Sequence, residues 1–338
     1  MKRKGLLFFI LSLAFILVLA GCGASKQDSQ QGGEQPKEQA QEPAKETPSQ
    51  IVIATGGTAG TYYPLGGGMA QIFTDKAGVN ATAQSTGASV ENMRLIRDEQ
   101  VDLAFTQSDI ADYATKGTVM FEGDQINNIR AIAALYPETI QIVVPAKSDI
   151  NSVADLKGKR VSVGAPGSGT EANAQQILEI YGMTFEDIKA ERLSFKESSS
   201  NIQDGVLDAA FVTAGAPTSA ITELSATTGV KIIQLEDDKI ADLIAKYPYY
   251  AEQVIPAGTY SGQDADVKTV AVKAMLVARD ALSDDAVYNM TKALFENLEQ
   301  LATVNAKAKV IKLEDALKGV SLDVHPGAAK YYEEKGVK

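Results

Sequence analysis

From Ile51 onward, short runs of β-branched and other apolar residues alternate with segments whose apolar residues recur at helical spacing. Alternation of this kind is typical of α/β domains, in which helices cover the faces of a sheet. In order along the chain we expect a strand at 51–54, a glycine-rich loop, a helix around 69–73, a strand at 79–84, a helix at 90–100 and a strand at 101–105.

The same order of elements returns about 109 residues later in the chain. The dipeptide Gly60-Thr61 corresponds to Gly169-Thr170, and the motif DxAF occurs at both 102–105 and 208–211. Because these matches have the same order in both halves, they predict two lobes of similar architecture. The second copy would contain a strand at 160–163, a loop at 164–170, a helix at 171–182, a strand at 191–195, a helix at 198–206 and a strand at 207–211.

The segments outside the two copies indicate how the lobes are joined. Strand-like runs at 131–136 and 139–144 are separated by Pro137, which suits a crossover between lobes. A strand at 231–235 follows the second copy, and a long strand-like run occupies 267–278.

Ser283 is then expected to be the N-cap of a helix that continues to Leu301. We interpret the C-terminal third as returning to the first lobe, so that two crossings form a hinge beside a central cleft. The predicted α/β fold has two mixed sheets flanked by helices, with lobe 1 at 51–138 and 238–338 and lobe 2 at 139–237.

The N-terminal segment has the pattern of a bacterial lipoprotein signal. A basic segment, 2–4, precedes an apolar run at 6–20 that is too short to span a bilayer comfortably, and Leu19-Ala20-Gly21-Cys22 resembles a lipobox. We expect a signal peptide at 1–21, lipidation of Cys22 and attachment to the outer face of the cell membrane. The alternative is a general signal peptide with an incidental cysteine. Residues 22–50 are polar, with almost no bulky apolar side chain, and predict a flexible linker.

The composition narrows the chemistry further. The 338 residues include one Cys, one His and no Trp, and 43 acidic against 32 basic side chains give a formal net charge of −11. These counts argue against a zinc site, a Ser-His-Asp triad and an internal disulfide, and the negative charge disfavours nucleic acid as a partner. We expect no metal and no cofactor. A structural or surface role is expected for His325, which has no evident catalytic partner.

Two loops rich in Gly, Ser and Thr each lie between a strand and a helix, where free backbone N–H groups and the helix dipole favour anions. Their hydroxyls at Thr58, Thr61, Ser168 and Thr170 could add uncharged donors. Facing each other across a cleft, the loops would suit a carboxylate. The alternative is that the glycines form tight turns and the hydroxyls cap helices. The chain lacks the nucleotide-binding motif GxxxxGK[ST]. A nominal GxGxxA motif occurs at 167–172, but a proline precedes it, and an exported protein would meet little intracellular cofactor. We therefore do not expect a nucleotide cofactor.

Six separated stretches, IATGGTAGTYYPLGGGMA, STGASVEN, FTQSD, VGAPGSGTE, FVTAGAPTSA and HPGAAKYYEE, together resemble the TAXI family, the TRAP-associated extracytoplasmic immunogenic solute receptors. The resemblance covers nearly all of 51–338. It implies a type II periplasmic-binding-protein fold that closes on a carboxylate, such as glutamate, glutamine or a dicarboxylic acid, and delivers it to a TRAP-type permease.

Carried over to matching positions, the resemblance also implies a set of cleft residues. Ser168 and Thr170 are assigned to a carboxylate, whereas Glu171 could pair with a ligand ammonium or act only as a dipole partner at its helix start. No arginine falls in these motifs, which leaves a neutral or weakly anionic ligand open. The predicted ligand-binding residues are Thr58, Tyr62, Ser85, Thr86, Asn92, Gln107, Tyr136, Ser168, Gly169, Thr170, Glu171, Ala214, Gly215 and Pro217.

The leading hypothesis is therefore a lipid-anchored, monomeric solute receptor that carries out no reaction and partners with a TRAP-type membrane permease. Lobe closure would be its mechanism, because contacts from both lobes favour the closed state. Two alternatives stay open: a receptor for an ABC importer or a sensor kinase, and an extracellular transferase or isomerase on the same two-lobed fold.

Overall fold

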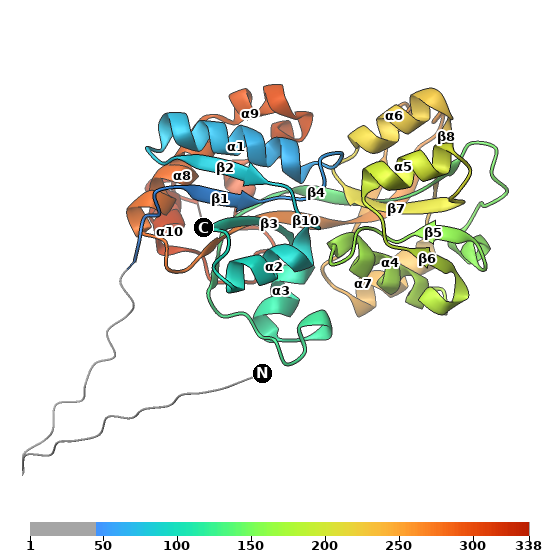
Figure 1. Cartoon of the computed structure of the whole chain (residues 1–338), viewed down its shortest axis with the longest axis horizontal. Helices are drawn as coiled ribbons and strands as arrows, with labels where there is room; N and C mark the ends of the chain where they lie inside the picture. The colour runs from blue at the N-terminus through green and yellow to red at the C-terminus, as the bar shows by residue number, and fades with distance from the viewer. Residues whose placement is uncertain (1–44, 338) are drawn as a thin grey trace, which may run out of the picture. The chain divides into compact units, whose positions relative to one another are not determined.

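The computed structural model describes residues 45–337, so the predicted signal peptide, Cys22 and most of the predicted linker lie outside the described residues. Ten strands form one mixed sheet in the order β2-β1-β3-β10-β4-β7-β5-β6, with β8 paired to β4 and β9 paired to β10 (Figure 1). The α/β prediction is confirmed, but the prediction of two separate sheets is wrong. The sheet is continuous because β4 (Ile129–Pro145) and β10 (Val267–Arg279) are long enough to run through both lobes.

Pro137 does not divide β4 into two strands, as its position suggested. It lies opposite Lys273 of β10, and the register between these strands shifts between Lys273 and Met275. An irregularity of this kind accommodates a residue that has no N–H to donate to the ladder.

The predicted repeat is confirmed in the strand pairing. In the first copy β1 pairs in parallel with β2 and β3, and in the second β5 pairs in parallel with β6 and β7. Helices lie on both faces of the sheet in both copies (Figure 1). The first copy contains β1 (Ile51–Ala54), α1 (Tyr62–Lys76), β2 (Ala81–Gln84), α2 (Ser89–Arg97), β3 (Leu103–Gln107) and α3 (Ser108–Lys116). The second contains β5 (Arg160–Ser162), α4 (Gly169–Ile180), β6 (Lys189–Glu191), α5 (Phe195–Gln203), β7 (Ala209–Ala214) and α6 (Ser219–Thr227).

The expected strand at 191–195 is shifted, because β6 ends at Glu191 and Ser194 caps α5. Ser283 is an N-cap as predicted, since its Oγ accepts a hydrogen bond from Ala286 N at 3.2 Å, but the expected single helix is interrupted at Asn297. The remaining elements are β8 (Val230–Ile233), α7 (Asp237–Lys246), β9 (Ala251–Ile255), α8 (Asp284–Glu296), α9 (Leu298–Val304) and α10 (Pro326–Lys335).

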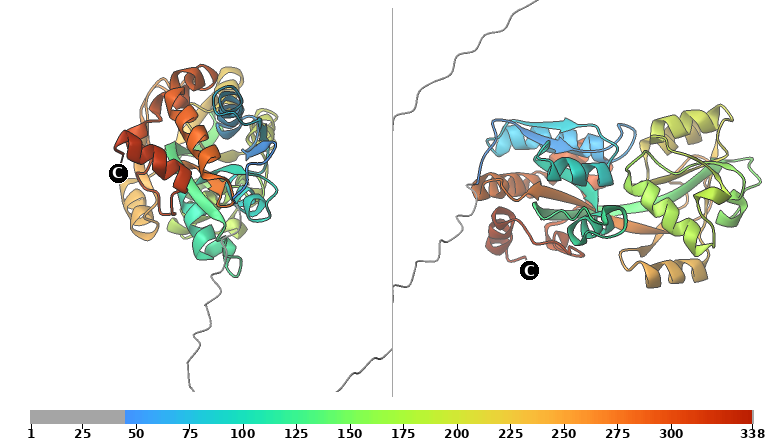
Figure 2. Two further views of the ribbon diagram at one scale, coloured as in Figure 1. Left: turned by 90° about the vertical axis from the view of Figure 1, so that its left-hand side faces the viewer. Right: turned by 60° about the horizontal axis from the view of Figure 1, so that its bottom comes forward.

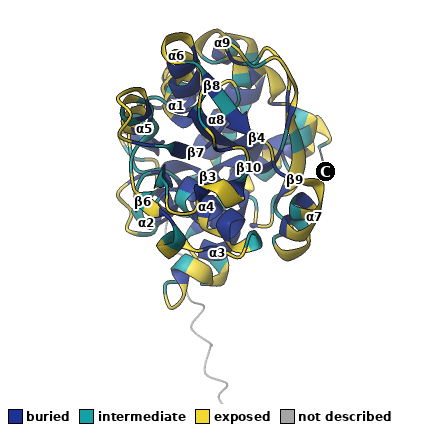
Figure 3. Cartoon of the chain, turned by 90° about the vertical axis from the view of Figure 1, so that its right-hand side faces the viewer, coloured by how far each residue is buried: buried dark blue, intermediate teal, exposed yellow. Residues whose placement is uncertain are grey.

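Each lobe has buried apolar clusters of its own, and exposed residues are concentrated on the outer faces of the helices (Figure 3). Two clusters draw on residues up to Tyr136 and from Ala274 onward, with Ala172 as an added member, and two draw on 140–272. Helix α8 packs on α1, and the views in Figure 2 show the C-terminal helices beside the first copy. We therefore propose lobe 2 as 139–272 and lobe 1 as the described residues on either side. This division moves 238–272, expected in lobe 1, to lobe 2.

The end of the predicted linker is attached to lobe 1. Glu46 N donates to Ala281 O at 2.8 Å, and Glu46 Oε1 accepts from Arg279 Nη2 at 2.9 Å. The ion pair between Lys45 and Asp284 extends this contact. The described end of the predicted linker is therefore held against lobe 1 from Lys45 onward. Among residues 45–337, no helix is long and apolar enough to cross a membrane.

Candidate functional site

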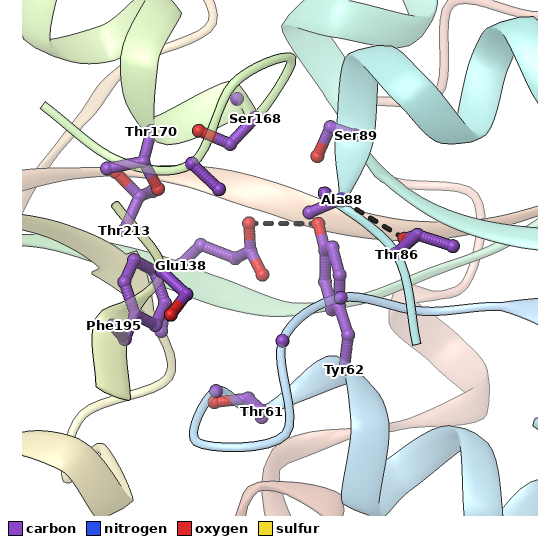
Figure 4. Close-up of a pocket in the computed structure, with 18 of the residues that line it drawn as sticks. Thr61, Tyr62, Thr86, Ala88, Ser89, Glu138, Ser168, Thr170, Phe195 and Thr213 are labelled. Atoms are coloured by element: carbon purple, nitrogen blue, oxygen red, sulfur yellow. Dashed lines mark hydrogen bonds between the residues drawn. The ribbon is translucent and has the colours of Figure 1, made fainter. Parts of the chain in front are cut away.

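A cleft between the two lobes brings together the loops that the sequence singled out. It has a volume of about 570 Å³, including space open to solvent, and the close-up in Figure 4 shows side chains from both lobes pointing into it. Lobe 1 supplies the β1–α1 loop, the start of α2, Gln107 and Glu138, and lobe 2 supplies the β5–α4 loop, the start of α5 and the end of β7. The lining residues are Gly56, Gly57, Gly60, Thr61, Tyr62, Thr86, Gly87, Ala88, Ser89, Gln107, Glu138, Ala165, Ser168, Gly169, Thr170, Ser194, Phe195, Thr213 and Ala214.

Half of the predicted ligand-binding residues line this cleft, and half lie outside its lining. The lining group is Tyr62, Thr86, Gln107, Ser168, Gly169, Thr170 and Ala214. The other group is Thr58, Ser85, Asn92, Tyr136, Glu171, Gly215 and Pro217.

Several residues of the second group support the lining rather than form it. Asn92 is fully buried, donates to Thr55 O and Phe105 O at 2.6 and 2.8 Å, and accepts from Thr86 Oγ1 at 2.6 Å. It thereby fixes the turn that carries Thr86. Gly215 N donates to Thr61 Oγ1 at 3.1 Å.

Three predicted residues face solvent: Thr58, Ser85 and Pro217 are exposed. Ser85 Oγ donates to Gly56 O at 3.0 Å and so braces the loop from outside.

Glu171 behaves as a partner of its own loop. Its Oε1 accepts from Arg192 Nε at 2.5 Å, and its Oε2 accepts from Gly167 N at 3.1 Å. With both oxygens engaged outside the cleft lining, Glu171 fits the helix-start interpretation better than a contact with a ligand ammonium.

The most informative residue missed at the sequence level is Glu138, a buried carboxyl at the crossover in β4 (Figure 4). Its Oε2 accepts from Tyr62 Oη at 3.0 Å, and its Oε1 accepts from Tyr136 Oη at 3.2 Å. Burial raises the pKa of Glu138 to about 8, because the ionised form is poorly solvated there, although the two phenols favour that form. Tyr136 therefore acts from behind the cleft, by orienting Glu138.

A signal for Glu138 existed in the sequence, since it is a charged residue between two apolar runs.

Other lining residues were missed for different reasons. Ser194 and Phe195 were missed because their local sequence predicted a strand rather than a helix start. Ala88 has a φ of 78°, and strain of this kind in a non-glycine residue is concentrated at functional sites. The other lining residues missed were Gly56, Gly57, Gly60, Gly87, Ser89, Ala165 and Thr213.

The cleft offers uncharged donors and a few free acceptors. Among the described residues, no Lys, Arg or His lines it, so an anionic group would be received by backbone N–H groups and hydroxyls at the starts of α1, α2 and α4. Within residues 45–337, Gln107 Oε1 and Thr213 Oγ1 are buried and have no hydrogen-bond partner. A buried polar atom without a partner costs free energy, so both favour a ligand that supplies one.

Hydrogen bonds join the lobes across the cleft. The backbone N–H groups of Val90 and Glu91, at the start of α2, donate to Gly167 O in lobe 2 at 3.1 and 3.0 Å. With the bond from Gly215 N to Thr61, they indicate a closed arrangement of the lobes.

The single histidine lies elsewhere, as expected. His325 is fully buried, and its Nδ1 accepts from Gly327 N at 3.2 Å as the N-cap of α10. Burial lowers the pKa of His325 to about 4. In the described part of the chain, no group of three or more His, Cys, Asp or Glu side chains is arranged to hold a metal ion.

Comparison with solved structures identifies the fold. The chain is similar to a protein from Bordetella bronchiseptica RB50, with 16% identity, a TM-score of 0.54 and coverage of 86% of this chain and 98% of that chain. It is also similar to PhnD1 from Prochlorococcus marinus (MIT 9301) in complex with methylphosphonate, with 12% identity, a TM-score of 0.53 and coverage of 86% and 99%. At these identities the likeness shows the fold, which is that of type II periplasmic binding proteins.

A weaker similarity is to the alkanesulfonate-binding protein SsuA from Xanthomonas axonopodis pv. citri bound to MOPS, with 15% identity, a TM-score of 0.48 and coverage of 78% and 83%. Residues 53–336, most of the chain, match the NMT1-like family. The chain belongs to the NMT1-like family.

Proposed function

We propose that this protein is an extracytoplasmic solute-binding receptor that captures a small carboxylate by lobe closure and delivers it to a membrane transporter. Family membership and the type II fold support a binding role. The six sequence stretches that resemble TAXI receptors support a TRAP-type permease as the partner, and the lipobox at Cys22 supports a lipid anchor.

The observation that carries the ligand class is the division of polar groups within the cleft. Donors surround its rim, at the starts of α1, α2 and α4, whereas the buried carboxyl of Glu138 and the free Gln107 Oε1 are acceptors. A carboxylate at the rim and an ammonium at Glu138 would match both sets. Among the expected carboxylates, this arrangement favours a glutamate- or glutamine-like amino acid over a dicarboxylate that lacks an amine.

A second candidate ligand is a phosphonate or sulfonate. The hydroxyl and N–H donors without a nearby cation could receive its oxygens, and PhnD1, which has the same fold, is in complex with methylphosphonate. Glu138 would then have to stay protonated beside the anion.

A thermal-shift panel of amino acids, dicarboxylates, methylphosphonate and alkanesulfonates separates these candidates. A ligand at 100-fold excess over its Kd should add about 2.7 kcal/mol to the free energy of unfolding. Stabilisation by amino acids would support the proposal. Stabilisation by phosphonates alone would mean that the ligand is a phosphonate and not a carboxylate. A panel with no stabilising compound would contradict carboxylate capture.

The variant Glu138→Gln tests the role of the carboxyl. It removes the charge that an ammonium would meet, and we expect amino-acid affinity to fall about tenfold or more, equivalent to about 1.4 kcal/mol. Because the pKa of Glu138 is about 8, wild-type affinity should rise from pH 6 to pH 8 and the variant should lose this rise. Glu171→Gln is the matched control, since Glu171 lies outside the lining, and it should bind as the wild type does. Equal losses in both variants would contradict the assignment.

The transporter class needs a separate experiment. In vesicles containing the candidate permease, a receptor for a TRAP system should support uptake driven by a cation gradient, whereas one for an ABC importer should require ATP. Turnover of the bound compound would instead establish an extracellular enzyme. Loss of membrane retention in the Cys22→Ala variant would support the lipid anchor.

A further inference from the structure

Below the cleft, helix α3 of lobe 1 and helix α4 of lobe 2 face each other across the lobe boundary. Asn173 Nδ2 donates to Asp109 Oδ2 at 3.2 Å, and one turn further along Gln176 Nε2 donates to Tyr113 Oη at 3.1 Å. These side chains form two successive polar contacts between the lobes.

A tyrosine completes this polar cluster. Tyr250 Oη, from the segment after α7, accepts from Asn173 Nδ2 at 2.8 Å and donates to Gln176 Oε1. Asp109, Asn173, Gln176 and Tyr250 are each 5% exposed or less, so the cluster is shielded from water. Both hydrogens of the Asn173 amide are thereby used, one toward Asp109 and one toward Tyr250.

The cluster is incomplete in one respect. Asp109 Oδ1 and Asn173 Oδ1 are both buried, and neither has a hydrogen-bond partner within residues 45–337. With Asp109 ionised, both atoms are acceptors and cannot satisfy each other. A proton on Asp109 Oδ1 would make it a donor to Asn173 Oδ1, and the carboxylic acid and the amide would then form two reciprocal hydrogen bonds.

The surroundings of Asp109 favour this proton. The titratable groups that face it are Asp112 and Tyr113 from α3, Tyr62 from α1, Glu138 from β4, and Tyr249 and Tyr250 from the segment after α7. All are acids or phenols, and the nearby cation Lys116 is paired with Asp112 at 2.8 Å. Burial raises the pKa of Asp109 to about 6, while backbone N–H groups and Asn173 oppose the increase.

We propose that Asp109 and Asn173 form a proton-binding site between the lobes, and that closure of the lobes takes up one proton there. The proton comes from solvent, resides on Asp109 Oδ1 and is donated in a hydrogen bond to Asn173 Oδ1. Ionisation of Asp109 leaves two unsatisfied buried acceptors at the interface and weakens the closed state. Closure therefore becomes easier as the medium is acidified.

The test uses ligand-free protein, so its result is independent of the proposed ligand. Spin labels at Glu122→Cys in lobe 1 and Lys189→Cys in lobe 2, both exposed, with Cys22→Ser to avoid a third label, report the distance between lobes. We expect the closed fraction to fall as pH rises from about 4, the ordinary pKa of an aspartate, to about 6, and to stay level from there to pH 8. A constant fraction would contradict the proposal.

Asp109→Asn mimics the protonated state, because its amide can both donate to and accept from Asn173. This variant should stay closed through pH 8 and lose this pH-dependent transition. The exchanged pair, Asp109→Asn with Asn173→Asp, places the carboxyl in lobe 2 and should restore a pH-dependent transition. A transition that persists in Asp109→Asn would assign it to another group.

Direct titration guards against variants that fail to fold. Carbon-13 NMR of the aspartate carboxyls in the wild-type protein should show a buried group with a midpoint near 6, absent from Asp109→Asn or, if that variant does not fold, perturbed in Asn173→Ala. A spectrum in which every aspartate titrates below pH 5 would overturn the proposal.

Discussion

The two copies of the repeat share one backbone plan but begin their helices differently. In lobe 2, Ser168 accepts from Glu171 N at the start of α4, and Ser194 forms a capping box with Glu197 at the start of α5. In lobe 1, as far as the described residues show, the N-cap residues of α1, α2 and α3 make no side-chain cap hydrogen bond.

This difference concerns which helix starts use their N–H groups in folding and which leave them available to a ligand. A side-chain cap satisfies N–H groups that a ligand would otherwise use. In lobe 2, α4 and α5 meet these needs internally, whereas α6 has no side-chain cap and its Ala220 N donates to Ala59 O of lobe 1 at 3.4 Å. In lobe 1, α2 receives its acceptor from Gly167 O across the cleft. The start of α2 thus depends on lobe 2 to complete its hydrogen bonds, which couples closure to the part of lobe 1 that lines the cleft.

The largest predicted contrast concerns the equivalent aspartates before β3 and β7. Asp102 Oδ2 accepts from Val52 N, and Asp208 Oδ2 accepts from Arg160 N, each at 2.8 Å. Asp102 also pairs with buried Arg279 at 2.9 Å, whereas the pair between Asp208 and Arg160 is partly exposed. Asp102→Ala should lower the free energy of unfolding by about 3 kcal/mol and Asp208→Ala by about 1 kcal/mol.

Urea denaturation of both variants measures this contrast. Asp102→Asn, which keeps an acceptor for Val52 N, should lie between the wild type and Asp102→Ala. Equal losses at the two aspartates would mean that the buried ion pair adds nothing to the shared backbone contact.

The repeat was predictable because its signals are local. The DxAF motif marks a strand start whose aspartate bonds to the neighbouring strand in both copies. The single sheet was not predictable in this way, since it depends on pairing between β4 and β10, which are more than 100 residues apart. Pro137 led to the wrong prediction of a break between two strands, because the irregular pairing with β10, and not the local sequence, accommodates the proline.

The second contrast concerns the matched glycines Gly60 and Gly169. A Cβ on Gly169 would overlap the buried side chain of Gln107 across the lobe boundary, whereas a Cβ on Gly60 would meet Gly57 O at 3.3 Å and Phe195 at 3.5 Å. Gly169→Ala should therefore oppose closure, at a cost of about 1–3 kcal/mol, and weaken ligand binding about tenfold or more. Gly60→Ala should change affinity much less.

Calorimetric titration with a ligand from the panel measures both affinities, and thermal unfolding without ligand is the control. If Gly169→Ala binds as tightly as the wild type, the side chain of Gln107 moves aside easily and does not set the closed position.

Part of the candidate site could be predicted from the chemistry of its loops, and part could not. Gly, Ser and Thr between a strand and a helix identified Thr61, Ser168 and Thr170, whose backbone positions the local sequence determines. Glu138 and Phe195 reach the cleft only through the crossing of β4 and the docking of α5. Glu171 was assigned from its position alone, and its partner Arg192 lies beyond the motif that suggested it.

The smallest contrast compares two serines that line the cleft: Ser194 of lobe 2, which caps a helix, and Ser89 of lobe 1, which does not. Ser194 Oγ accepts from Glu197 N at 3.3 Å, and its own N–H donates to Glu197 Oε2 at 2.9 Å. Ser89 is at the matching helix start but follows the N-cap Ala88, and it lines the cleft. Ser194→Ala should lower the free energy of unfolding by about 1 kcal/mol. Ser89→Ala removes no cap hydrogen bond from this buried position, so it should lower the free energy of unfolding by less than Ser194→Ala does, and it should weaken ligand binding. Urea denaturation and calorimetry of the two variants decide the matter: if Ser89→Ala is the less stable, α2 does have a side-chain cap in solution, and the two lobes begin their helices alike.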